Sequence, residues 1–163
     1  MTRRLVTAVA VTAAIAAAWW LWPTDTRRIR SRLTSLASAV SVPAGEPDLQ
    51  RVTRLAALAR GLALDVSLHP GDGMPILADR DAVVALASRL GSIGGPTSIE
   101  LSNIEIDVDA DGRDAVATAL VRVRTGGDAV RPLDNHVVRF ELVKVDGDWL
   151  LRRAAPEQAL VRP

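Results

Sequence analysis

The stretch VKVDGDWLL, residues 143–151, decides how the C-terminal part of the chain folds. Asp146 and Gly147 lie between two apolar segments, and this dipeptide is typical of a two-residue turn between antiparallel strands. The sequence therefore predicts a strand over residues 136–145, a tight turn, and a last strand over residues 148–154.

The segment before this hairpin also has the two-residue periodicity of strands. Apolar residues alternate along 99–108 but change parity at Ser102 and Asn103, which predicts a strand with a bulge there. Residues 109–113 are rich in Asp and Gly and predict a hairpin turn. A return strand is expected over 115–125.

The N-terminal half has the periodicity of helices, with apolar residues three and four positions apart. Helices are expected over residues 26–42, from Asp48 to about Gly61, and over 79–90, with a short strand over 62–68. The positions expected to face the core are Ile29, Leu33, Leu36 and Val40 in the first helix, Leu49, Val52, Leu55, Ala56 and Ala59 in the second, Leu62, Leu64, Val66 and Leu68 in the strand, and Val83, Leu86 and Leu90 in the third helix.

This order of elements predicts an α+β domain in which three helices pack on a mainly antiparallel sheet. In front of it, residues 5–22 form an uncharged run that ends at Pro23. As a helix the run would be about 27 Å long, close to the roughly 30 Å hydrocarbon core of a bilayer. A cleaved signal peptide would have the same basic start, and the small residues 16–18 suit a peptidase.

Tryptophans at the end of this run favour an uncleaved membrane anchor over a signal peptide. Trp19, Trp20 and Trp22 are residues that a membrane interface selects. We therefore expect residues 1–23 to hold the chain in the lipid bilayer as a single-pass anchor, and residues 24–163 to form the folded domain.

Charge is uneven along the chain, whose net charge is +1. The first 32 residues hold six Arg and one Asp, so Arg27 and Arg28 are expected at the membrane interface, near lipid headgroups. A basic but merely solvated helix face is the alternative. The short basic tail favours a domain on the periplasmic or extracellular side of a bacterial membrane. Because the rest of the chain is net acidic and poor in rings, nucleic acid is not an expected partner.

Composition excludes several kinds of chemistry. The chain has no Cys and no Tyr, which rules out disulfides, a thiol nucleophile and phenol-based acid catalysis. Residues 107–112 match half of a calcium loop, but the closing position is Thr118 in place of Glu, so a hairpin turn is the better interpretation. With two His and no Cys, no metal and no cofactor is expected.

The element order and the hairpin at 143–151 resemble the nuclear transport factor two-like superfamily, which includes SnoaL-like cyclases and ketosteroid isomerases. The resemblance covers about residues 26–155. It implies a curved sheet wrapped around helices into a cone, whose open end is a pocket in enzymes and an interaction surface in other members. It also implies that two copies can pair through their sheets.

The resemblance suggests candidate site residues. His69, followed by Pro70, stands where the isomerases have their carboxylate base, and Asp65 is its candidate catalytic neighbour. Arg122, His136 and Trp149 would line the pocket. The isomerase-like sites stabilise an enolate with Tyr, which this chain lacks.

Three functional hypotheses follow. The leading one is a membrane-tethered, non-catalytic binding or assembly module that holds a protein partner or a second copy of itself. The second is a small-molecule isomerase or cyclase with His69 as base. The third is a binder of hydrophobic ligands, which needs the cavity but no base.

Overall fold

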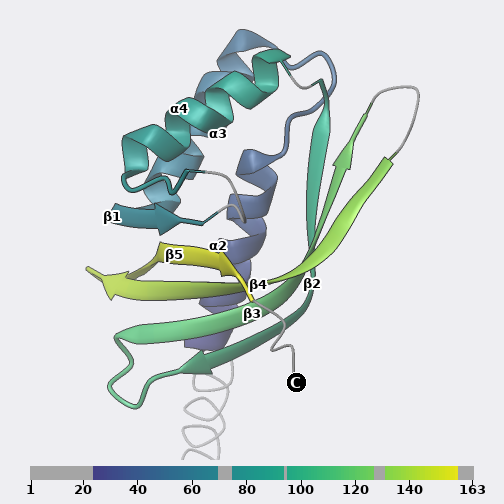
Figure 1. Ribbon diagram of the computed structural model, residues 1–163. Coiled ribbons are helices and arrows are strands. Elements are labelled where there is room, and N and C mark those ends of the chain that lie inside the picture. Colours follow the sequence, from purple (N-terminus) through teal and green to yellow (C-terminus); the bar gives the residue numbers. More distant parts are fainter. Residues whose placement is uncertain (1–23, 70–74, 94, 127–130, 158–163) are drawn as a thin grey trace, which may run out of the picture.

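The computed structural model describes residues 24–69, 75–93, 95–126 and 131–157 (Figure 1). Within them, α2 packs against β2 and β5, while α3 and α4 lie together at one end of the sheet. The elements in chain order are α2 (Asp25–Val40), α3 (Asp48–Gly61), β1 (Leu62–Leu68), α4 (Arg80–Ile93), β2 (Thr97–Val108), β3 (Asp114–Thr125), β4 (Arg131–Val145) and β5 (Asp148–Pro156).

The strands form a five-stranded sheet in the order β1-β5-β4-β3-β2. The last strand, β5, is therefore inserted between β1, with which it pairs in parallel, and β4, with which it pairs antiparallel. The remaining pairs are antiparallel, and at one end β2, β3 and β4 bend to run beside α2, where the start of β2 meets the α2–α3 connection (Figure 1). The α+β prediction is confirmed, with a mixed sheet.

The turns predicted from local sequence are confirmed. Asp146 and Gly147 have φ angles of 51° and 89°, and positive φ at both central positions defines the type I′ turn that suits a tight hairpin. The pairing of β2 with β3 shifts after Ser102, where Asn103 has a φ of 51°. A bulge thus lies where the apolar alternation changes parity.

The core lies between the helices and the inner face of the sheet. Trp149 on β5 is 2% exposed and Phe140 on β4 packs against the buried cluster, so both rings beyond the N-terminal segment serve the core. From α2, the buried residues are Ile29, Leu33, Leu36 and Ala39. The stripe predicted for this helix is confirmed, except that Ala39 is more buried than Val40.

The face predicted for α3 is wrong at the start of the helix, although Leu55 packs against the core as predicted. Leu49 is 81% and Val52 64% exposed, whereas Leu58 and Gly61 are buried. A Cβ atom on Gly61 would lie 2.6 Å from Cδ2 of Leu36, so this glycine lets α3 approach α2 closely. The helix is rotated towards that contact, and the apolar residues of its first turn face outward.

Two other predicted core positions are also wrong. Leu64 on β1 is 74% exposed because the register between β1 and β5 shifts between Leu62 and Ser67, which breaks the expected alternation. Leu86 on α4 is 40% exposed, while Ala87 is buried beside Val83.

The predicted anchor, with Trp19, Trp20 and Trp22, lies outside the described residues. Among the residues that are described, no helix is both long enough and apolar enough to cross a bilayer.

Candidate functional site

The candidate base His69 lies at the end of β1 and is half-buried. Its backbone N–H donates to the carbonyl oxygen of Ala154 at 2.8 Å, and its Nε2 lies 3.0 Å from Oγ of Ser67. The hydroxyl of Ser67 thus forms a hydrogen bond with one of the two ring nitrogens of His69.

The other predicted site residues do not gather around His69. Asp65 and His136 are exposed, and Trp149 is buried in the core with its indole N–H directed at Asp25. His69, Asp65, His136 and Arg122 line neither the groove on the flank of the described domain nor the two grooves at the start of α2.

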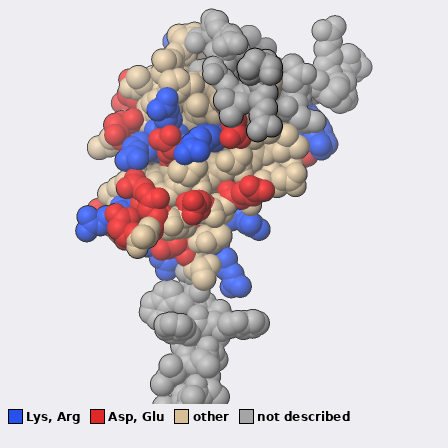
Figure 2. Space-filling view, turned by 60° about the horizontal axis from the view of Figure 1, so that its bottom comes forward, with Lys and Arg blue, Asp and Glu red and all other residues tan. Residues whose placement is uncertain are grey.

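Arginines on the strands pair with carboxylates across the sheet. Nη1 of Arg124 lies 2.8 Å and Nη1 of Arg122 3.8 Å from the carboxylate of Glu100. Arg152 is likewise 3.0 Å from Asp114. Basic and acidic side chains are accordingly interspersed on the face seen in Figure 2. Arg122 therefore forms an ion pair at the surface, which differs from the pocket-lining position predicted for it.

The largest of the grooves lies between α2, α3, the start of β2 and the end of β3, and we call it the flank groove. Its volume is about 840 Å³. The described residues that line it include seven hydroxyl side chains and two arginines, but no His, Asp or Glu. The lining residues are Ser35, Ser38, Ala39, Ser41, Val42, Pro43, Gln50, Thr53, Arg54, Ala57, Pro96, Thr97, Ser98, Arg124, Thr125 and Gly126.

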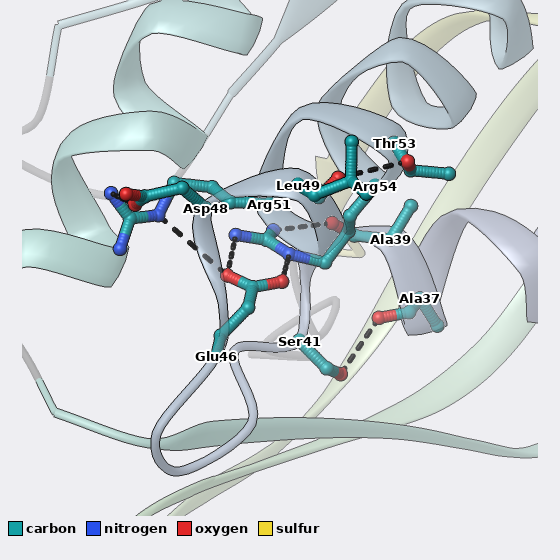
Figure 3. A network of polar contacts seen from close by, with 9 residues as sticks. All are labelled: Ala37, Ala39, Ser41, Glu46, Asp48, Leu49, Arg51, Thr53 and Arg54. Carbon is teal, nitrogen blue, oxygen red and sulfur yellow. Dashed lines mark hydrogen bonds and ion pairs between the residues drawn. The ribbon is translucent and has the colours of Figure 1, made fainter.

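A buried ion pair fixes one wall of the flank groove (Figure 3). The Nε and Nη2 atoms of Arg54 donate to the two carboxylate oxygens of Glu46 at 2.6 and 3.0 Å, and Nη1 donates to the carbonyl oxygen of Ala39 at 2.7 Å. The two side chains are only 8% and 3% exposed. These hydrogen bonds from Arg54 hold the pKa of Glu46 below its usual value, against the opposing effect of burial.

A hydroxyl and a backbone bridge fix the opposite wall. Oγ of Ser41 donates to the carbonyl oxygen of Ala37 at 2.8 Å and accepts from the backbone N–H of Ile99 at 2.9 Å. Val42 and Thr97 exchange two backbone hydrogen bonds of 2.7 and 2.8 Å. The α2–α3 connection is thereby tied to the edge strand β2, so the groove exists without a ligand.

A second charged network, which we call the basal clamp, lies at the start of α2. Nζ of Lys144 donates to both carboxylate oxygens of Asp25 at 2.9 and 3.0 Å, and Nε1 of Trp149 donates to Oδ1 at 3.1 Å. The hydrogen bond from Lys144, and then that from Trp149, lowers the pKa of Asp25. The clamp joins the first described helix to the last hairpin.

Sequence reasoning missed both networks. The chain has a single lysine, Lys144, in a set of basic residues that are otherwise arginine, and that was the one available signal for the clamp. Nothing in the local pattern distinguished Glu46 or Arg54 from surface charges.

The described residues form a small α+β domain with one groove on its flank and another at the start of α2. The profile of the family described as SnoaL-like domain matches residues 54–155, more than half of the chain. The chain therefore belongs to the SnoaL-like domain family.

Solved structures share this fold at low sequence identity. A proposed aromatic ring hydroxylase from Novosphingobium aromaticivorans has a TM-score of 0.66 at 17% identity, covering 85% of this chain and 90% of that one. A proposed scytalone dehydratase from the same species scores 0.61 at 20% identity, covering 85% and 89%. A proposed dehydratase of the NTF2-like family from Streptomyces avermitilis scores 0.61 at 18% identity, covering 83% and 98%. At these identities the likeness concerns the fold alone. No curated protein matches the sequence.

Proposed function

We propose that this protein is a non-catalytic binding module whose partner occupies the flank groove, and that its N-terminal segment tethers it to a membrane. The observation that carries the proposal is the lining of the groove. It offers hydroxyl, amide and guanidinium groups but no His or carboxylate, and the candidate base His69 is not part of it. Such a site can hold a ligand but has no group to move a proton near neutral pH.

The chemistry of the groove favours a protein segment as the partner. Hydroxyl groups both donate and accept hydrogen bonds, as a peptide backbone also does, and Gln50 has the same capacity. No aromatic ring is among the described lining residues, so there is no surface on which a planar ligand could stack. Most of the exposed surface of the groove is apolar, and a protein segment can cover it with apolar side chains while its backbone meets the hydroxyl groups.

The tether is supported by the uncharged sequence of residues 5–22 and by the three tryptophans among its last four residues. With a short basic tail on the inner side, the domain stands on the periplasmic or extracellular side. A chain that alkaline carbonate washes release from native membranes would contradict the tether.

Two neighbouring alanines of α3 provide a matched test of the binding site. Both are exposed, but only Ala57 lines the flank groove. We expect Ala57→Trp to fill the groove and abolish co-purification of a stable partner from detergent-solubilised native membranes, while Ala56→Trp retains it. Equal recovery of the partner with both variants would place the interaction elsewhere on the domain.

An isomerase-type or cyclase-type enzyme is the second candidate, because the chain belongs to a family whose fold relatives include proposed dehydratases. Its test is His69→Gln. A turnover that this variant loses and Ala57→Trp keeps would favour the enzyme over the binding module.

A further inference from the structure

The start of α2 carries a separate groove, which we call the basal groove. Its volume is about 490 Å³. One wall is the first half of α2 and the other is the hairpin between β4 and β5. The described residues that line it are Arg27, Arg28, Ser31, Arg32, Ser35, Gly147, Asp148 and Trp149. A second groove, of about 470 Å³, shares Arg27, Ser31 and Ser35 with it and adds Arg30.

The basal groove has an excess of positive charge. Three guanidinium groups line it against one carboxylate, that of Asp148, which is 77% exposed and lies 3.5 Å from Arg32. Arg27 and Arg28 are exposed and form no ion pair with any other described residue. In Figure 2, basic side chains flank the point at which the described chain begins.

The two walls are held together before any ligand binds. Asp25, at the start of α2, takes both Lys144 and Trp149 of the hairpin as hydrogen-bond donors. The groove therefore brings together residues that lie more than a hundred positions apart in sequence. The positive end of the α2 dipole adds to the attraction for an anion there.

Guanidinium groups flanked by hydroxyls are suited to phosphate, which arginine binds through two parallel hydrogen bonds. The predicted membrane segment ends at Trp22, only five residues before Arg27. Five residues span at most about 17 Å, so Arg27 stays close to the headgroup layer, which is roughly 5–8 Å deep. We propose that the basal groove binds the phosphate groups of anionic phospholipids in the bilayer that holds the N-terminus. This inference rests on the proposed tether.

The test compares the full chain in nanodiscs of phosphatidylcholine alone and of phosphatidylcholine with phosphatidylglycerol. Arginines are modified with phenylglyoxal, and the rate at each position is measured by mass spectrometry. A basic residue close to an anionic surface gains about fivefold in binding. We therefore expect Arg27 and Arg28 to react about fivefold more slowly in the anionic discs, and Arg122 at the same rate in both. Equal rates for Arg27 and Arg28 in the two kinds of disc would overturn the proposal.

Matched variants and a phosphate control identify the source of the anion. Arg27→Gln with Arg28→Gln should remove the protection of Arg32 in anionic discs, whereas Arg122→Gln with Arg124→Gln, which removes the same charge from the sheet, should retain it. Millimolar inorganic phosphate is added to the neutral discs as a control. If it protects the arginines as strongly as anionic lipid does, the groove binds free phosphate, and the proposal of lipid binding is overturned.

Failure of the tether itself has a different result, because the chain would not co-purify with discs of either kind. The same modification assay with added phosphatidylglycerol vesicles then tests the groove. Protection of Arg27 and Arg28 would support lipid binding without a tether, and no protection would overturn it.

Discussion

The two ends of α2 are each tied down by a carboxylate and a cation, but in contrasting surroundings. Near the end of the helix, Glu46 and Arg54 are 3% and 8% exposed and lie eight residues apart. At its start, Asp25 and Lys144 are 31% and 25% exposed and lie 119 residues apart. The first pair lies within the connection from α2 to α3, whereas the second joins the start of α2 to the hairpin between β4 and β5.

Exposure to solvent explains why the two ion pairs are expected to contribute differently to the free energy of unfolding. A buried ion pair that loses one member leaves a charge that water cannot reach, and this costs far more than the intact pair contributes. A partly exposed pair is screened, and water replaces a missing partner. The flank groove thus has a wall that tolerates no change of charge, whereas the basal clamp can be weakened with the fold retained.

The largest expected effect is that of Arg54→Met. The variant removes both close hydrogen bonds to the buried carboxylate of Glu46 and leaves it only Nε of Arg51 at 3.9 Å, so we expect the free energy of unfolding to fall by about 3–5 kcal/mol. Urea denaturation followed by circular dichroism measures the loss. The double variant Glu46→Gln with Arg54→Met should recover part of it, since no unpaired charge remains. A loss below about 1 kcal/mol for Arg54→Met would show that the pair is not sealed from solvent.

Asp25→Asn should cost less, about 1–2 kcal/mol, because charge-assisted hydrogen bonds from Lys144 are weakened while water has access to the site. The same denaturation experiment measures it. Asp148→Asn is the matched control at the same end of α2. Its carboxylate is 77% exposed and pairs with Arg32 at 3.5 Å, so a change of no more than about 0.5 kcal/mol is expected. Equal losses for the two variants would show that Asp25 stabilises the fold no more than an exposed carboxylate at the same end of α2.

Ser41→Ala tests the wall of the flank groove without changing charge. The backbone N–H of Ile99 loses its acceptor, and we expect a loss of about 1 kcal/mol. Ser38 lies on α2, three residues before Ser41, and lines the same groove but is exposed, so Ser38→Ala should leave the free energy of unfolding nearly unchanged. A larger loss for Ser38→Ala than for Ser41→Ala would contradict this assignment.

The smallest expected change in the free energy of unfolding is the one caused by low pH. The pKa values of Glu46 and Asp25 are lowered by folding, so each carboxylate stabilises the fold above its unfolded pKa, about 4.3 for Glu and 3.9 for Asp. That stability is lost as pH falls through the lower pKa of the folded state. Protonation keeps the size of the side chain, so its effect is smaller than that of substitution. Unfolding measured from pH 7 to pH 3 should show a weaker pH dependence for Glu46→Gln than for the wild type, and an unchanged dependence would refute the role of Glu46.

Features set by neighbouring residues could be predicted from the sequence. The turn at Asp146 and Gly147 and the bulge at Asn103 follow from backbone preferences of a few residues, and both are confirmed. The face of α3 could not be predicted, because its rotation depends on the close contact between Gly61 and Leu36, residues of different helices.

The grooves were less accessible to prediction than the fold. Arg27 and Arg28 were assigned to the membrane interface from sequence, and the structure adds that they line a groove with the hairpin. That assignment to the interface stays a prediction. The flank groove was missed, because its walls come from α2, α3, β2 and β3, and no single segment carries a motif for it.

The place of β5 in the sheet has a consequence for synthesis of the chain. This strand is made last, yet it lies between β1 and β4, and its Trp149 reaches back 124 residues to Asp25. Until β5 leaves the ribosome, β1 has no partner strand in the sheet and the core lacks Trp149, the larger of its two rings. Contacts between such distant residues form slowly. The sheet is therefore completed only after β5 has been made, and a chain truncated before residue 148 would expose the edge of β4.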